Sequence, residues 1–156
     1  MAAMLIKASY IFMSLIVLLS NVFPALFGGK TYIDPNGDTV TIVDGIDIGD
    51  ENLVITDYES FKALGDVGVT YDEAFFETNN LAVFSVEHDE RYTFYLTSVW
   101  TDGKNMEARF YFDPPKGMTA AIYLPTNKTV FIETTKDVTM LRSVRADYVE
   151  LFKPAI

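Results

Sequence analysis

The chain has 156 residues, which is enough for one domain and too few for two ordinary ones. Hydrophobic residues make up 49% and aromatic residues 14%, so the composition argues against disorder and predicts a ring-rich core. A formal net charge of −10 argues against nucleic acid and anionic lipid surfaces as partners, because like charges repel. The lack of cysteine excludes disulfides, thiol nucleophiles and cysteine–zinc sites.

An apolar segment opens the chain. Lys7 precedes a mostly apolar run from Ala8 to Gly29, and a positive residue before an apolar run is typical of export signals. The run is long enough to span a bilayer, which takes about 20 residues. Cleavage after Ala25 or Gly28 would leave a bulky side chain three residues before the cut. We therefore predict an N-terminal hydrophobic helix in residues 1–29 that is a signal peptide or an uncleaved membrane anchor; a buried helix of a soluble protein is the remaining alternative.

The rest of the chain is predicted to lie outside the cytoplasm. With Lys7 on the cytoplasmic side, residues 30–156 would face outward, either secreted or tethered to the membrane by an uncleaved anchor. They would form a single extracytoplasmic, acidic, β-rich domain. The absence of cysteine favours a bacterial source, since many bacterial exported proteins have none.

Turn residues divide this domain into short apolar runs. Pro35-Asn36-Gly37 is a turn between two runs, and Asp102-Gly103 between alternating runs predicts a hairpin. The segment 138–152 fits a helix or a strand, and we favour the strand. The other predicted strands are 30–34, 39–43, 53–55, 81–87, 92–100, 105–112, 119–124 and 129–134, with a turn at 125–127. On the hairpin, the predicted core face carries Tyr92, Phe94, Leu96, Trp100, Met106, Ala108, Phe110 and Phe112, with Glu107 and Arg109 pointing outward.

Two short helices are predicted between the third and fourth strands. Thr56 and Glu59 have the spacing of a capping box, in which the threonine caps the helix and the glutamate reaches back. Asp72 is the expected cap of the second helix, which would end at Asn79-Asn80 in the left-handed conformation. The predicted fold class is therefore α+β, a mostly antiparallel sheet or sandwich with two short helices.

One stretch resembles a known family. In Tyr71–Phe84, a Phe-Phe helix turn leads through asparagine into an apolar strand, and a hairpin and a proline-rich break at 113–117 follow. This order is similar to that of the C-terminal domain of PrcB-type protease-complex accessory proteins, over residues 53–136. Glu90-Arg91-Tyr92 stands where that family would have Gly-Gly-Tyr. The resemblance implies an extracytoplasmic accessory or interaction domain without known catalytic residues.

His88 is the only histidine, and Ser85 and Asp89 lie near it. Successive side chains of a strand point to opposite faces, so His88 and Asp89 are poorly placed to pair as in a catalytic triad. We predict that residues 87–90 form a polar turn. No catalytic residue and no cofactor is predicted.

Four acids cluster within a short stretch: Asp44, Asp47, Asp50 and Glu51. Clustered carboxylates can bind Ca²⁺, which prefers six or more oxygen ligands, but they can equally form a solvated acidic loop. The turn at Asp34 begins like a calcium loop, yet Thr39 stands where that loop needs glycine. Calcium is thus an alternative hypothesis for the four acids, and a plain hairpin turn is favoured at residues 34–38.

The favoured function is that of a non-catalytic interaction or accessory domain with a protein partner, associated with an envelope or secreted protease. A sheet edge such as residues 129–134 would be a suitable docking site. The alternatives are a calcium-stabilised surface domain and a small hydrolase that uses carboxylates, although no spacing among the 22 acids selects a catalytic pair.

Overall fold

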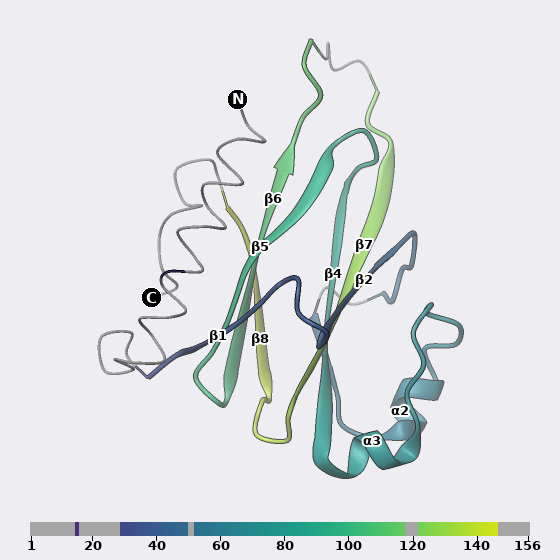
Figure 1. Cartoon of the computed structure of the whole chain (residues 1–156). Helices are drawn as coiled ribbons and strands as arrows, with labels where there is room; N and C mark the ends of the chain where they lie inside the picture. The colour runs from purple at the N-terminus through teal and green to yellow at the C-terminus, as the bar shows by residue number, and fades with distance from the viewer. Residues whose placement is uncertain (1–14, 16–28, 50–51, 118–121, 147–156) are drawn as a thin grey trace.

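Alternating apolar residues build two sheets in the computed structural model, which describes residues 15, 29–49, 52–117 and 122–146. One sheet has the strand order β1-β5-β6-β8 and the other the order β2-β7-β4-β3 (Figure 1). We call them sheet A and sheet B. Sheet A consists of β1 (Thr31–Ile33), β5 (Thr93–Thr101), β6 (Asn105–Asp113) and β8 (Met140–Arg145). Sheet B consists of β2 (Val40–Asp44), β7 (Pro125–Thr135), β4 (Asn79–Asp89) and β3 (Asn52–Ile55).

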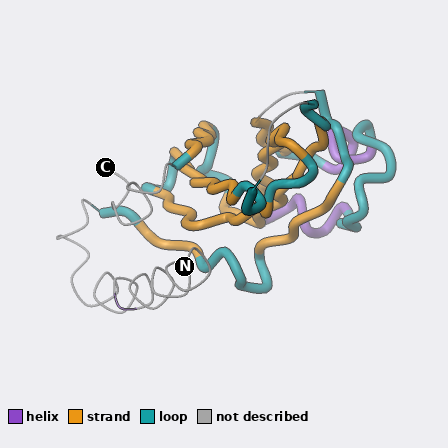
Figure 2. The backbone as a smooth tube through the Cα atoms, turned by 90° about the horizontal axis from the view of Figure 1, so that it is seen from above, coloured by secondary structure: helices purple, strands orange, loops and turns teal. Residues whose placement is uncertain are grey.

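In sheet B, β4 is buried on both faces. Phe84 and Val86 of β4 pack towards sheet A, in a core that also takes Phe110 of β6. Leu81 and Val83 of the same strand point the other way, towards α2 (Tyr58–Lys62) and α3 (Glu73–Thr78). Seen from above in Figure 2, the helices lie beside one of the two layers of strands. The α+β sandwich predicted from the sequence is therefore confirmed.

Both helices begin at an aspartate. The Asp72 carboxylate accepts a hydrogen bond from the Phe75 amide at 2.9 Å, as predicted. In α2 the cap is Asp57 rather than Thr56, because the Asp57 carboxylate accepts from the Ser60 amide at 2.8 Å. The predicted left-handed end of α3 is also wrong: Asn79 is extended, with φ of −125°, since β4 starts there.

The chain crosses between the sheets where a hairpin was predicted. β1 pairs with β5 and β2 pairs with β7, so the two strands flanking Pro35-Asn36-Gly37 belong to different sheets. The turn itself is present, since Asp34 accepts from the Asn36 amide at 2.9 Å and from the Gly37 amide at 2.9 Å. Turn residues thus located the break in the chain, whereas distant strands determine the pairing.

The predicted hairpin of β5 and β6 is confirmed, but one residue, Trp100, lies on the opposite face of the sheet from the one predicted. Asp102 accepts from the amides of Lys104 and Asn105, and these hydrogen bonds lower its pKa to about 2. A bulge between Leu96 and Ser98 shifts the register. Trp100 therefore does not share the core face of Leu96 as predicted; its ring meets that of Tyr32 at 5.2 Å.

Two predictions near β7 need correction. The predicted turn at 125–127 lies inside β7, which begins at Pro125, a position where a strand tolerates proline. The predicted strand at 119–124 is not formed in its described part, since Ile122–Leu124 is irregular. Residues 118–121 lie outside the described residues.

The ambiguous segment 138–152 is a strand over Met140–Arg145, and its remainder from residue 147 lies outside the described residues. This strand, β8, runs parallel to β6, whereas the other pairings among the described strands are antiparallel. The buried Asn80 amide donates to the carbonyls of Lys136 and Val138, at 3.2 and 3.3 Å. Asn80 thereby fixes the crossing from β7 to β8.

The predicted apolar helix within residues 1–29 lies outside the described residues except at positions 15 and 29. In the part of the chain that the structure describes, no helix is long and apolar enough to span a membrane.

Candidate functional site

Polar side chains gather at the end of the sandwich where β4 turns into β5. The Tyr92 amide donates to the Asp89 carbonyl at 2.9 Å and closes a tight turn between the strands. β4 runs through Asp89, so the prediction that residues 87–90 form a polar turn is wrong for all but its last residue. We call this region the β4–β5 end; it also includes Ile122–Leu124 and the end of β8.

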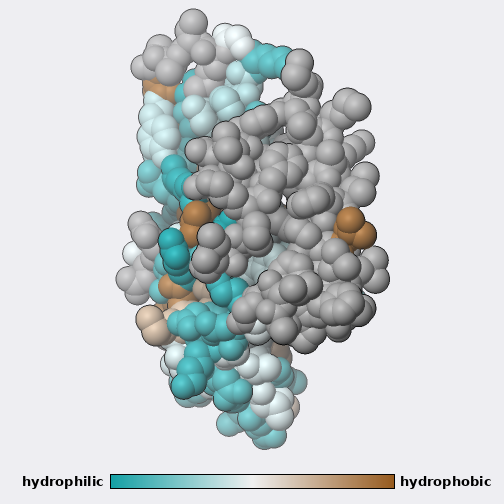
Figure 3. All heavy atoms as spheres, turned by 90° about the vertical axis from the view of Figure 1, so that its left-hand side faces the viewer, coloured by the Kyte–Doolittle hydropathy of each residue, from teal (hydrophilic) through white to brown (hydrophobic). Residues whose placement is uncertain are grey.

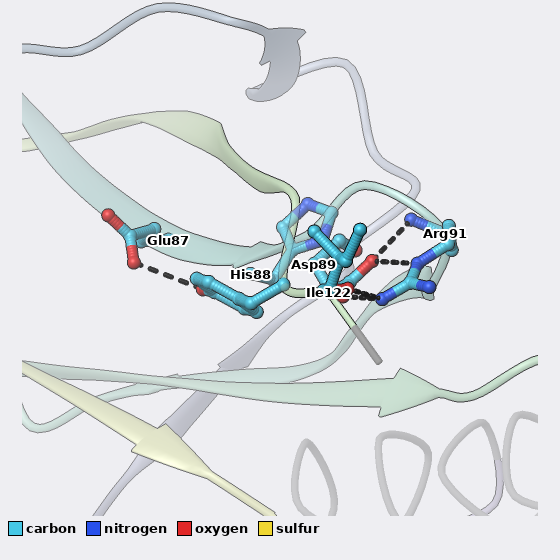
Figure 4. Close-up of polar contacts among 6 residues, drawn as sticks. Glu87, His88, Asp89, Arg91 and Ile122 are labelled. Carbon is cyan, nitrogen blue, oxygen red and sulfur yellow. Dashed lines mark hydrogen bonds and ion pairs between the residues drawn. The ribbon is translucent and has the colours of Figure 1, made fainter. Parts of the chain in front are cut away.

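An ion pair organises this end (Figure 4). Asp89 is buried, and its carboxylate accepts from the Arg91 side chain at 2.7 Å and from the Arg91 amide at 3.1 Å. The Arg91 guanidinium also donates to the Ile122 carbonyl. The hydrogen bonds from Arg91 hold the pKa of Asp89 well below its usual range, although burial opposes them. The pair ties the segment before β7 to the turn after β4.

His88 is buried between the sheets rather than exposed in a turn. Its ring lies 5.1 Å from Phe112 and 6.2 Å from Phe94, measured between ring centroids. Its Nδ1 lies 2.7 Å from the carbonyl oxygen of Asp89. A carbonyl only accepts, so Nδ1 carries a hydrogen and donates it to Asp89. Among the described residues, the buried Nε2 atom of His88 has no hydrogen-bond partner.

One hollow at this end is a polar cleft of about 720 Å³ between β4 and β8. The Tyr123 hydroxyl donates to the Glu87 carboxylate at 3.0 Å, and Arg145 donates to the Glu87 carbonyl. The Arg145 guanidinium also lies 4.9 Å from the Phe112 ring centre. The lining residues that bear on function are Asp47, Ser85, Glu87, Tyr123, Ser143 and Arg145.

An exposed apolar run stands at the rim of this cleft. Ile122, Tyr123 and Leu124 are 67%, 54% and 37% exposed. The backbone of the run is held at both ends, by Arg91 on the Ile122 carbonyl and by the Glu90 amide on the Leu124 carbonyl at 2.8 Å. The run is therefore displayed by specific contacts, although it belongs to no helix or strand.

Another hollow, of about 380 Å³, is lined by His88. Its walls come from β2, β4, β5, β7 and the β4–β5 turn, and Asp44 forms an ion pair with Lys128 in it. The lining residues are Asp44, His88, Glu90, Tyr92, Thr93, Phe94, Thr126 and Lys128. We call it the His88 pocket.

The four calcium candidates are only partly placed. Asp44 pairs with Lys128, and Asp47 accepts from the Gly49 amide at 2.9 Å. Asp50 and Glu51 lie outside the described residues. Within the described ranges, no three acidic or histidine side chains come close enough to hold a metal ion. The calcium site stays a prediction, because half of its candidate ligands are not described.

The proposed docking edge at residues 129–134 is wrong. This segment belongs to β7, which lies between β2 and β4 and is covered on both sides. A stretch without a paired strand occurs instead on β4: β3 begins at Asn52, opposite Phe84, and no described strand pairs with the outer side of Ser85–Asp89, where Arg145 donates to the Glu87 carbonyl. That stretch opens on the polar cleft.

No protein-family model, curated protein or solved structure matches the chain. The fold and site by themselves define a two-sheet sandwich with a helical layer on one sheet and a polar cleft at one end. The resemblance to PrcB-type accessory domains remains a prediction.

Proposed function

We propose that residues 30–156 form a non-catalytic interaction domain outside the cytoplasm, which binds a protein partner at the β4–β5 end. The observation that carries the proposal is the exposed run Ile122–Leu124 at the rim of the polar cleft. Large apolar and aromatic side chains beside a cleft are typical anchors of protein interfaces.

The run is suited to binding because it is ordered beforehand. The contacts from Arg91, Glu90 and Glu87 hold its backbone and the Tyr123 ring. A partner would therefore lose less conformational entropy in fixing these side chains than in fixing a free loop. The outer side of Ser85–Glu87, with which no described strand pairs, offers a second contact, at which an extended segment of the partner could add a strand by displacing Arg145 from the Glu87 carbonyl.

Charge favours a basic partner. The chain has 22 acidic residues against 12 lysines and arginines, so its field attracts a cationic surface and speeds encounter. The resemblance to accessory domains of protease complexes makes an envelope or secreted protease the first class of partner to examine.

The proposal is tested by comparing variants in a cross-linked pull-down. The tagged full chain, in detergent, serves as bait for the envelope and medium of the source organism. We expect Ile122→Ser/Leu124→Ser to weaken capture of the specific partner about tenfold, since loss of interface anchors typically costs more than 1 kcal/mol. Met140→Ser is the matched control, because Met140 is 65% exposed and begins β8 at the opposite end of the sandwich.

The outcomes separate the hypotheses. Capture that is lost with Ile122→Ser/Leu124→Ser but kept with Met140→Ser supports docking at the β4–β5 end. Equal capture by both variants would refute that site. A folded bait that captures no specific protein would refute the interaction function and leave the calcium-stabilised domain and the carboxylate-dependent hydrolase as the remaining hypotheses.

A further inference from the structure

We propose that the C-terminal segment, residues 147–156, docks on the outer face of sheet A, which is the face turned away from sheet B. The segment itself lies outside the described residues, whereas the face that it would cover is described. This inference goes beyond the proposed function, because it concerns a contact within the chain and needs no partner protein.

The outer face of sheet A is aromatic and buried. Tyr95 and Trp100 of β5 and Tyr111 of β6 lie on it, outside the core that the two sheets share. Trp100 is 2% exposed and Tyr111 is 9% exposed. Both described helices pack on sheet B, so no helix in the described part of the chain covers these rings. Burial of this degree within a single chain indicates that a further segment of the same chain covers the face.

An ion pair on the same face is shielded as well. The Arg109 guanidinium donates to the Glu107 carboxylate at 2.9 Å, and each side chain is only 12% exposed. On an open sheet face this pair would be accessible to water, since long charged side chains are mostly exposed in proteins. A cover over the face accounts for both the rings and the ion pair.

The chain leaves β8 beside these rings. The Ala146 amide donates to the Phe110 carbonyl at 2.8 Å, so the chain still follows β6 at the residue before the segment. Ala146 is 8% exposed and packs with Tyr111 and Tyr95. The C-terminal segment therefore starts at the edge of the aromatic face.

The segment also has the composition and the length to cover the face. Five of its ten residues have bulky apolar or aromatic side chains, whose burial is favourable: Tyr148, Val149, Leu151, Phe152 and Ile156. From Tyr95 to Trp100, β5 extends about 17 Å at about 3.3 Å per residue. Ten residues span about 15 Å as a helix and up to about 33 Å when extended, so the segment can reach Trp100.

The N-terminal apolar segment within residues 1–29 is the other segment that borders this face, because β1, at the edge of sheet A, begins at Thr31. The choice of the C-terminal segment rests on the proposed location outside the cytoplasm, since export or membrane insertion takes the N-terminal segment away from the sheet.

A single spin label tests the contact. The chain has no cysteine, so Ala155→Cys gives one labelling site, and its one tryptophan gives one indole N–H signal in NMR spectra. In the full chain in detergent, we expect the label to abolish the Trp100 signal by paramagnetic broadening. The Glu77 amide of α3 should keep its intensity, because α3 lies on the far side of sheet B.

Leu151→Ser/Phe152→Ser in the labelled chain should restore the Trp100 signal, because it removes the apolar contacts. Glu150→Gln is the matched control from the same segment and should leave the signal lost. A Trp100 signal that survives the Ala155 label, or that stays lost in a folded Leu151→Ser/Phe152→Ser chain, would overturn the docking. The Ala155 label alters no large side chain, so the first measurement decides even where the double variant does not fold.

A second label, on Ser14→Cys, distinguishes the two segments. Loss of the Trp100 signal with the Ser14 label and not with the Ala155 label would show that the N-terminal segment covers the face, which contradicts both the docking and the proposed export of that segment. Loss with neither label would contradict the docking alone.

Discussion

Arg91 holds Asp89 ionised in a buried position, and this has a consequence for acid stability. The pKa of Asp89 is lowered in the folded state, so the pair stabilises the fold above the ordinary carboxyl pKa of about 4, and this contribution is lost as the pH falls through the lowered pKa. We expect Arg91→Gln to raise the pKa of Asp89. The melting midpoint of this variant should then decrease less steeply below about pH 4 than that of the unmodified chain. Circular-dichroism melts from about pH 2 to 7 measure this.

Arg142→Gln is the control for that measurement, since the Arg142 guanidinium lies 3.4 Å from Glu107 and its side chain is 71% exposed. Between about pH 2 and 4, the melting midpoint of Arg142→Gln should change with pH as it does in the unmodified chain. An equal decrease of the melting midpoint at acid pH in the unmodified chain and in Arg91→Gln would show that Asp89 does not govern acid stability.

Tyr71 makes the opposite prediction at high pH. Burial, together with the neighbouring Glu133, raises its pKa to about 12. A raised pKa contributes stability that is fully present below the unfolded value of about 10 and is lost as the pH rises through the folded value. We expect Tyr71→Phe to remove part of the loss of stability between pH 10 and about 12, as measured by urea unfolding at each pH. An unchanged alkaline slope would contradict the assignment.

Local signals predicted some residue roles and missed others. The cap at Asp72 could be predicted because it needs only a local partner, the Phe75 amide three residues along the chain. The surroundings of His88 could not be predicted, since Phe112 and the pocket walls come from other strands. Tyr123 and Arg145 were missed for the same reason: only the folded chain brings both of them to Glu87.

At the scale of elements, Asn80 is expected to control the crossing from β7 to β8. Asn80→Ala would leave the carbonyls of Lys136 and Val138 without their donor, which typically destabilises a protein by about 1–3 kcal/mol. Urea unfolding followed by fluorescence measures the change. Asn105→Ala is the comparison, because Asn105 is exposed and its amide donates to the Asp102 carboxylate in a surface turn. Equal losses in both variants would mean that the buried position of Asn80 has no special effect.

Most strand positions could be predicted from alternation and turn residues, which are local. The partners could not, because β1 and β2 look like a hairpin in the sequence but join different sheets. The bulge at Leu96/Ser98 also escaped prediction, and with it the face of Trp100. The stretch of β4 without a paired strand depends on where β3 begins, so the docking edge could not be located from local patterns.

At the scale of the whole molecule, the net charge of −10 should lower stability through self-repulsion. Figure 3 shows one face, on which the described residues are mostly hydrophilic. We expect the melting midpoint to rise between about 10 and 150 mM NaCl, because salt shortens the Debye length from about 30 to 8 Å. Choline chloride at the same ionic strength should act equally if the effect is screening. A midpoint that stays constant would argue against self-repulsion.

The calcium hypothesis is tested with the same measurement. A specific site would raise the midpoint in about 1 mM CaCl₂ beyond the rise in MgCl₂ at equal ionic strength, since a ligand bound only by the folded state stabilises it. Asp47→Asn should reduce that difference. No shift with Ca²⁺ would reject the calcium-stabilised domain.

The order in which the strands join the two sheets also affects when the protein can fold during synthesis. β4 lies at the centre of sheet B, yet its main neighbour β7 begins only at Pro125, after the whole β5–β6 hairpin. At about 5–20 residues per second, a ribosome takes seconds to make the intervening chain, and pairing between such distant strands is itself slow. Until then the apolar stretch of β4 has only the short β3 as a strand partner, at Leu81–Phe84. A nascent chain that closes so late stays unfolded long enough to be threaded through a translocation channel, as the proposed location outside the cytoplasm requires.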